Sequence, residues 1–260
     1  MKTIKNKILL VLFIAAAGFF IFESFNVARA TLIESEDYDS QFEMYDIGVT
    51  LNENGEAIAW RNYNGDDSDN PWSVSENARL MTAISKVRYG EVYNEVLSVT
   101  NSGQVDEYVR VTIYKYWVDE DGNKTYGLDP ELIKINLSNE ENWIEDEDYR
   151  TDERTVLYYI LPLTGSESGA AGTTENFMES VMLDGRIKNY VIQSESEKDA
   201  DGHTVVTNVY KYDGKTFCID VGVDAIQTHN AEDASLSAWG RQIKIDETTG
   251  ELSLVKEDKD

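Results

Sequence analysis

Apolar and polar residues alternate over residues 108–117 (YVRVTIYKYW), and this period of two constrains the fold more than any other feature of the sequence. In an extended strand, successive side chains point to opposite faces of a sheet. One face carries the apolar residues Val109, Val111, Ile113 and Trp117. The other carries the tyrosine-rich set Tyr108, Arg110, Thr112, Tyr114 and Tyr116. The pattern predicts a long strand with its first face in a core. We expect the tyrosine face to pack against neighbouring strands, with a carbohydrate or peptide platform as the alternative.

Similar alternation predicts further strands at residues 46–51, 92–100, 155–161, 190–194, 203–212, 215–226 and 242–245. Between them, four dipeptides favour tight turns because their residues tolerate left-handed backbone conformations. These dipeptides are Asn54-Gly55, Asp121-Gly122, Asp201-Gly202 and Asp213-Gly214. We interpret them as hairpin turns between consecutive strands.

Helical signals are short and few. Residues 230–240 begin with Asn230 as an N-cap, continue with acidic residues in the first turn and stop at Gly240. A second short helix begins with Pro130 at its first position, and residues 75–85 favour a third. The sequence therefore predicts that helices only decorate a fold built from strands.

Many strands, few helices and no βαβ alternation predict an all-β fold. We expect an antiparallel β-sandwich of jelly-roll type with a few short helices, as a single domain over residues 46–260. The only cysteine, Cys218, lies on the predicted strand at residues 215–226, so no intramolecular disulfide can hold this domain together. We expect a buried structural thiol, with an intermolecular disulfide as the alternative.

The N-terminus has the pattern of a cleavable secretory signal. Lysines precede an apolar run over residues 8–22, and the small residues Ala28 and Ala30 occupy the two positions that a signal peptidase reads. The apolar run is shorter than the roughly 20 residues that a bilayer-spanning helix needs, so a retained membrane anchor is the weaker alternative. We therefore predict a signal peptide over residues 1–30, cleavage after Ala30, and an exported protein.

Residues 161–165 (LPLTG) fit the LPxTG pattern by which sortases attach proteins to a cell wall. A sortase signal also needs an apolar span and a basic tail after the pentapeptide, whereas residues 256–260 are polar and acidic. Pro162 and Gly165 instead favour a turn and loop between two strands. We predict a secreted protein of the extracellular matrix or cell surface that is not sortase-anchored and has no membrane contact after cleavage.

Charge and residue inventory exclude several function classes. The formal net charge is −26, which repels nucleic acid and anionic lipid. His203 and His229 are the only histidines, and their spacing fits no metal motif. Residues 119–122 and 199–202 resemble calcium loops, but the glycine comes too early and the bidentate glutamate is missing, so we expect turns. We predict no catalytic residues, no metal, no cofactor and no enzymatic activity.

Residues 93–117 (YNEVLSVTNSGQVDEYVRVTIYKYW) resemble the "V-x-N-x-G … Y-V-R-V" core of the TasA/camelysin-like family, which includes clostridial BsaA-type, SipW-dependent biofilm matrix proteins and pilins. Further matches follow in the same order: LDPELI at 128–133, Trp143, ERTVLYY at 153–159, Pro162-Leu163, VDAIQTHN at 223–230 and AWG at 238–240. The matching motif residues that we single out are Asn101, Gly103, Tyr108, Arg110, Trp117, Pro130, Tyr159, Gln227, Asn230, Trp239 and Gly240.

The resemblance implies a jelly-roll subunit that polymerises outside the cell into fibres or pili of a Gram-positive biofilm matrix. In such fibres the N-terminal segment freed by cleavage adds as a strand to the next subunit. Here this segment is residues 31–45, which begins with Thr31, Leu32 and Ile33. A disordered acidic leader is the alternative. The implied partners are further copies in a head-to-tail homopolymer, other matrix or pilus subunits, and a SipW-type signal peptidase.

Two other functions stay open at this point. The family includes camelysin-like cell-surface metalloproteases, although the sequence offers no ligand set for a catalytic metal. An accessory adhesin that binds matrix polymers through exposed aromatic residues such as Trp60, Tyr63 and Trp72 is compatible with a role in a fibre.

Overall fold

The computed structural model describes residues 46–63, 73–74, 80–81, 87–138, 141–198, 201 and 203–256. The chain divides into two units, Met1–Met44 and Tyr45–Asp260, and all described residues belong to the second. The predicted signal peptide, the predicted donor segment and most of the helix expected at residues 75–85 lie outside the described residues. Leu80 and Met81, the described part of that helix, form a turn.

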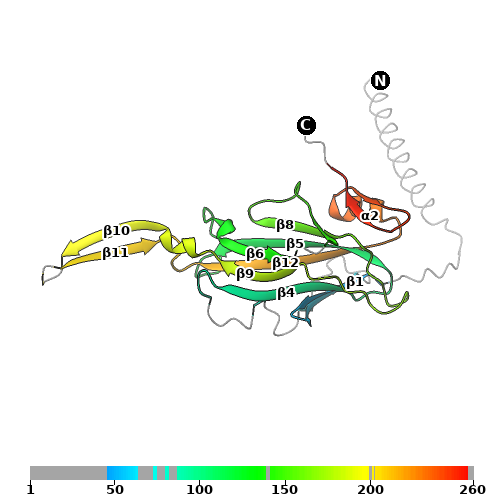
Figure 1. Ribbon diagram of the computed structural model, residues 1–260, viewed down its shortest axis with the longest axis horizontal. Helices are drawn as coiled ribbons and strands as arrows, with labels where there is room; N and C mark the ends of the chain where they lie inside the picture. Colours follow the sequence, from blue (N-terminus) through cyan, green and yellow to red (C-terminus); the bar gives the residue numbers. More distant parts are fainter. Residues whose placement is uncertain are drawn as a thin grey trace, which may run out of the picture. The chain divides into compact units, whose positions relative to one another are not determined.

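Two antiparallel sheets form a β-sandwich (Figure 1). The six-stranded sheet contains, in spatial order, β3 (Ser73–Val74), β2 (Glu56–Asn62), β1 (Gly48–Glu53), β4 (Val92–Asn101), β9 (Met178–Leu183) and β6 (Ile133–Leu137). The four-stranded sheet contains β12 (Thr216–Gln227), β5 (Glu107–Val118), β8 (Arg154–Tyr159) and β7 (Trp143–Glu145). From β4 onward the chain passes repeatedly from one sheet to the other, as it does in jelly rolls. The predicted all-β sandwich is confirmed.

Two smaller elements flank the sandwich. Strands β10 (Val191–Lys198) and β11 (Thr204–Tyr210) pair only with each other and form a ribbon that extends from one end of the sandwich (Figure 1). Strands β13 (Ile243–Ile245) and β14 (Leu252–Leu254) form a second hairpin, which follows the helix α2 (Ala231–Trp239). Two 3₁₀ turns complete the order, η1 (Pro130–Leu132) before β6 and η2 (Gly185–Asn189) before the ribbon.

The core lies between the two sheets, where the predicted apolar face of β5 is buried. Val109, Val111 and Ile113 pack there with Leu97 and Val99 of β4. Burying each such side chain contributes roughly 1.5–3 kcal/mol, which is what fixes the register of these strands. Trp117 belongs instead to a separate cluster at one end of the sandwich, where β5 meets η1 and η2.

The tyrosine-rich face of β5 is only partly exposed, because the C-terminal elements cover one end of it. Tyr108 packs with Tyr158 of β8, Trp239 of α2 and Leu252 of β14 in a second cluster. Tyr114, further along the strand, is exposed. The predicted packing therefore holds at the beginning of β5, where the neighbouring strand β8, the helix α2 and the hairpin strand β14 all supply contacts.

Two of the predicted turns are present, and one predicted hairpin is wrong. Asn54 and Gly55 adopt positive φ angles of 52° and 87° and close the β1–β2 hairpin, as expected. Asp119 accepts hydrogen bonds from the amides of Asp121 and Asn123, so residues 119–122 form a turn. The hairpin predicted at Asp213-Gly214 is wrong, because β11 pairs with β10 while β12 pairs with β5. That turn carries the chain from the ribbon into the sandwich.

The helix signals and the cysteine also need corrections. Asn230 lies at the N-cap position, but with a left-handed backbone (φ 53°) and no side-chain hydrogen bond to the helix. Gly240 ends α2 as predicted, with φ 66° and its amide donating to Leu236. Pro130 opens η1, where the Asp129 carboxylate accepts from the amide of Glu131. Cys218 is half-buried rather than buried, and desolvation raises the pKa of its thiol.

Candidate assembly surface

A loop at residues 102–104 holds the beginning of the described chain and the start of β1 in place. The Gln104 amide donates to the Asp46 carbonyl (2.7 Å), and the Ser102 amide donates to the Gly48 carbonyl (2.8 Å). The Asp46 amide in turn donates to Oε1 of Gln104 (3.2 Å). We call residues 46–48 together with residues 102–104 the N-terminal clamp. It fixes the point at which the preceding segment of the chain joins the sandwich.

The motif residues Asn101 and Gly103 build this clamp. The Asn101 side chain is fully buried; its Nδ2 donates to the carbonyls of Val105 (2.8 Å) and Leu163 (3.0 Å), and its Oδ1 accepts from the Gly103 amide (2.8 Å). A Cβ atom at Gly103 would overlap the Asp46 carbonyl oxygen and lie 2.7 Å from the Gly48 nitrogen. Asparagine therefore shapes the loop, and glycine lets residues 46–48 approach it.

A buried carboxyl group lies beside the clamp. Glu107 is fully buried at the start of β5, and neither of its carboxyl oxygens makes a hydrogen bond of normal geometry with the described residues. Desolvation raises its pKa to about 9, and the nearby Gly48 amide opposes this shift only in part. The group is therefore neutral at pH 7.

Other motif residues attach the C-terminal elements to the sandwich. The Tyr108 hydroxyl donates to the Gly250 carbonyl (2.6 Å). Arg110 pairs with Asp224 of β12 (2.7 Å) and donates to the Trp239 carbonyl (3.2 Å), while its guanidinium lies over the Trp239 ring. The Trp239 ring also meets Tyr158 edge-on at 5.4 Å. These residues are packing and positioning groups rather than an open binding site.

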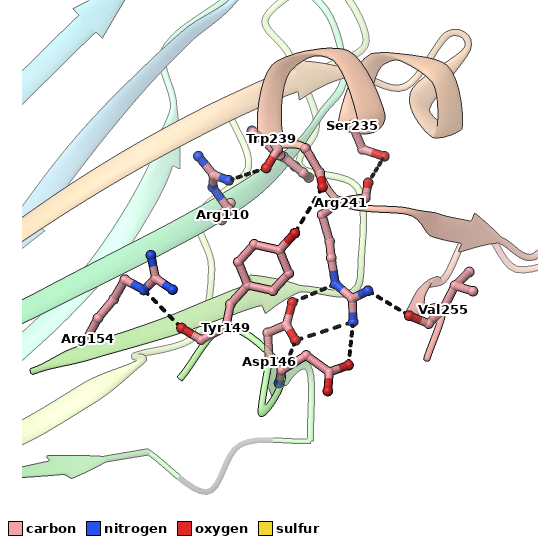
Figure 2. A network of polar contacts seen from close by, with 10 residues as sticks. Arg110, Asp146, Tyr149, Arg154, Ser235, Trp239, Arg241 and Val255 are labelled. Atoms are coloured by element: carbon pink, nitrogen blue, oxygen red, sulfur yellow. Dashed lines mark hydrogen bonds and ion pairs between the residues drawn. The ribbon is translucent and has the colours of Figure 1, made fainter. Parts of the chain in front are cut away.

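A buried ionic network completes this attachment, as Figure 2 shows. Arg241, which is 2% exposed, pairs with Asp146 through Nε (2.7 Å) and donates to the Val255 carbonyl (2.7 Å). Its Nη2 also reaches Asp148 (3.4 Å), and the Tyr149 hydroxyl donates to the Gly240 carbonyl (3.1 Å). Sequence reasoning missed this network. In a run of acids at residues 145–148, nothing in the sequence distinguishes the buried carboxylate from its solvated neighbours.

The remaining motif residues lie at the ends of the sandwich or in its core. Trp117 donates through Nε1 to the Asp129 carbonyl (2.9 Å) next to Pro130, and its ring packs on Tyr212 at 4.9 Å. Tyr159 packs on Trp143 within the core. Gln227 is the exposed last residue of β12 and pairs with Glu107. Ala28, Ala30, Thr31, Leu32 and Ile33 lie outside the described residues.

Strand β12 forms one edge of the four-stranded sheet. It pairs with β5 without interruption from Thr216↔Val118 to Gln227↔Glu107. Because the Thr228 amide donates to the Asp106 carbonyl, the even-numbered residues of β12 bond to β5 and the odd-numbered residues direct their amides to the free edge. Among the described residues, only one of these outward amides has a partner: Ala225 donates to the Tyr63 hydroxyl (3.1 Å).

The two halves of this edge differ. At the second half, Arg61 of β2 pairs with Asp224 (3.2 Å) near the Ala225 contact, and Val223 and Ala225 are buried. At the first half, Phe217, Ile219 and Val221 point to the same core face but stay partly exposed. We call residues 216–222 the open half of β12. It combines backbone groups that have no partner among the described residues with an incompletely covered core. A further strand can pair with such an edge and cover the core.

No helix in the described ranges is long and apolar enough to cross a bilayer. Over the same part of the chain, no group of three or more His, Cys, Asp and Glu side chains is arranged to hold a metal ion. Comparison of the chain with models of protein families, with curated proteins and with solved structures finds no match.

Proposed function

We propose that this protein is an exported structural subunit of extracellular fibres or pili in a Gram-positive biofilm matrix, of the TasA/camelysin-like kind. Successive copies assemble head to tail, and the N-terminal segment of one copy adds as a strand to the next. The observation that carries the proposal is the open half of β12, where outward amides and a partly exposed core lie together. The subunit has no catalytic role.

The proposed donor segment is long enough for this task. Extended at about 3.3 Å per residue, residues 31–45 span about 50 Å, whereas the open half of β12 needs only about 23 Å. Either Leu32 or Ile33 would face the core beside Phe217 and Ile219, because adjacent residues of a strand point to opposite faces. Backbone pairing then supplies affinity, and the apolar residue supplies register.

The proposed processing follows from the same arrangement. Cleavage after Ala30 by a SipW-type signal peptidase frees the donor segment outside the cell. The LPLTG pentapeptide lies in the loop after β8, where Gly165 packs against the backbone of Gln104 and its amide donates to the Asp106 carboxylate (2.9 Å). A pentapeptide held in a folded loop supports release into the matrix rather than sortase anchoring.

The experiment tests the acceptor edge with a pair of matched variants. Ile219→Pro removes an outward amide that has no partner among the described residues, so pairing with β5 is kept and strand addition is blocked. Ile219→Ala removes the side chain but keeps the amide. We expect negative-stain electron microscopy of the chain beginning at Thr31 to show fibres for the unmodified protein and for Ile219→Ala, and none for Ile219→Pro.

Donor variants complete the design. Deletion of residues 31–40, or a tag left on Thr31, should abolish fibres and leave a folded monomer. A mixture of the deletion and Ile219→Pro should stop at dimers, since one chain only accepts and the other only donates. Fibres of normal length from the deletion would refute strand donation, and equal fibre yields from both Ile219 variants would refute the β12 edge as acceptor.

A further inference from the structure

Most of the large apolar side chains that the described structure exposes gather at one end of the sandwich. They belong to the ribbon or to its immediate surroundings: Tyr89, Val92, Tyr190, Val191, Ile192, Val205, Val206, Val209 and Tyr210. Apolar surface concentrated in this way marks interaction sites, whereas single exposed apolar residues are ordinary. The ribbon end of the sandwich is therefore a candidate contact surface.

The ribbon has few contacts of its own. Every residue of β10 and β11 is exposed, and a two-stranded hairpin is marginally stable by itself in water. Its strands contain no proline and only three charged residues, Glu195, Glu197 and Lys198, in a chain of net charge −26. Two copies of so acidic a chain repel each other. A contact through the weakly charged ribbon therefore has the lowest electrostatic cost.

The base of the ribbon is anchored to the sandwich around an open cleft. This tyrosine cleft has a volume of about 300 Å³ and is lined by Tyr89, Ile187, Lys188, Tyr210, Tyr212 and Asp213. Tyr212 is buried between Trp117 (4.9 Å) and Tyr190 (5.5 Å), and its hydroxyl accepts from the Asp129 amide. The ribbon therefore extends from an anchored base and can present its surface to a partner in a defined position.

The ribbon and the N-terminal clamp lie at opposite ends of the sandwich. Strand β4 runs from Val92, beside the ribbon, to Asn101 at the clamp, and β5 runs from Glu107 at the clamp to Val118. At about 3.3 Å per residue, these strands separate the two ends by roughly 30–40 Å. Asp46, where the described chain begins, therefore lies at the end of the sandwich opposite to the ribbon.

We propose that the ribbon and the tyrosine cleft of one copy dock on the clamp end of a second copy, the end from which the donor segment emerges. This inference rests on the proposed head-to-tail polymer. The ribbon and the cleft offer about twenty residues, the size of one side of a standard protein interface. Docking fixes the orientation of successive subunits while the donated strand runs from the clamp end along the neighbour's open half of β12.

The test removes the ribbon without touching the sandwich. Since Val191 and Tyr210 are paired, replacing residues 192–209 by Asn-Gly closes the strands with a two-residue turn. The matched milder variant replaces Val205, Val206 and Val209 by Thr, which has a similar shape and a high strand propensity. We expect the ribbon deletion to raise the critical concentration for fibres by about tenfold or more, and the threonine variant to raise it less.

A peptide of residues 31–45 separates failure of this inference from failure of the proposed function. The ribbon deletion, made in a chain that begins at Tyr45, should bind this peptide as tightly as the same chain with its ribbon. Peptide binding together with an unchanged critical concentration overturns ribbon docking alone. A second outcome is that neither peptide binding nor fibres are seen. In that case, oligomers in sedimentation that depend on the ribbon would support docking and refute strand donation. Monomers at every concentration would overturn both proposals.

A photo-crosslinking residue at Val206 identifies the contacted surface. Crosslinks to residues 46–48 or 102–104 of another copy are the expected result. Crosslinks between two ribbons would overturn head-to-tail docking in favour of a closed dimer. Binding of a soluble matrix polysaccharide that is lost with the ribbon, while fibres form normally, would overturn the inference in favour of a carbohydrate ligand.

Discussion

Ionisation of Glu107 makes the stability of the protein fall as pH rises. In the unfolded chain this carboxyl group titrates near its ordinary pKa of 4.5, whereas in the folded protein burial raises the pKa to about 9. Between these values the unfolded state binds fewer protons than the folded state. The free energy of unfolding therefore decreases by about 1.4 kcal/mol per pH unit from this group alone. Its contribution is fully present below pH 4.5 and is lost as pH rises through 9.

Replacement of Glu107 by Gln or Met removes this titration. Both substitutions are similar to glutamate in size, and neither can ionise, so the comparison does not depend on how well one of them packs. Between pH 5 and pH 7 the unmodified protein should lose about 3 kcal/mol more stability than either variant. For a domain of this size that corresponds to roughly 6–12 °C in melting temperature.

The assay is urea unfolding at half-unit intervals from pH 5 to pH 9, with Glu56→Gln as a control that removes one exposed carboxylate. Glu95 adds a second downward slope, because burial and the neighbouring Glu53 raise its pKa to about 8. A Glu95→Gln, Glu107→Gln double variant should therefore be the least pH-dependent. If both single Glu107 variants retain the full slope of the unmodified protein, the neutral buried carboxyl is refuted.

Two further perturbations test the packing at the ends of the molecule. Asp146→Ala leaves the buried Arg241 without its main partner and should cost about 3–5 kcal/mol, whereas Asp146→Leu combined with Arg241→Met should recover most of that loss in urea unfolding. Gly103→Ala places a Cβ against the start of β1 and should cost about 1–3 kcal/mol, with faster exchange of the Ser102 and Gln104 amides, which donate to the Gly48 and Asp46 carbonyls. Gly185→Ala, which meets open space, is its control and should be nearly neutral. Unchanged exchange in Gly103→Ala would contradict the clamp.

Several strands of the sandwich were predictable because alternation reports burial on one face, a property of each segment by itself. Residues 108–117 are an example, since Val109, Val111 and Ile113 are buried as the pattern requires. The Asn54-Gly55 turn and the end of α2 at Gly240 were predictable for a similar reason, because their backbone conformations depend on neighbouring residues only.

Features that depend on distant partners were not predictable in this way. The Asp213-Gly214 turn has the composition of a hairpin turn, yet β11 pairs with β10 and β12 pairs with β5, where Val223 and Ala225 are buried in the core. Alternation alone cannot name the neighbour of a strand. Asp146 was missed for the same reason. What distinguishes it from the other acids is its contact with Arg241, which lies 95 positions further along the chain.

The clamp connects a short motif near the middle of the chain with the point at which the described chain begins. Asn101 and Gly103 lie far from the N-terminus in sequence, but they shape the loop that holds Asp46 and Gly48 in place. Trp117 and Pro130 help to fix the opposite end, from which the ribbon extends. The motif residues thus fix the relative position and orientation of the two ends of the sandwich. A head-to-tail polymer needs that relation, because an angular error at each contact would accumulate along the filament.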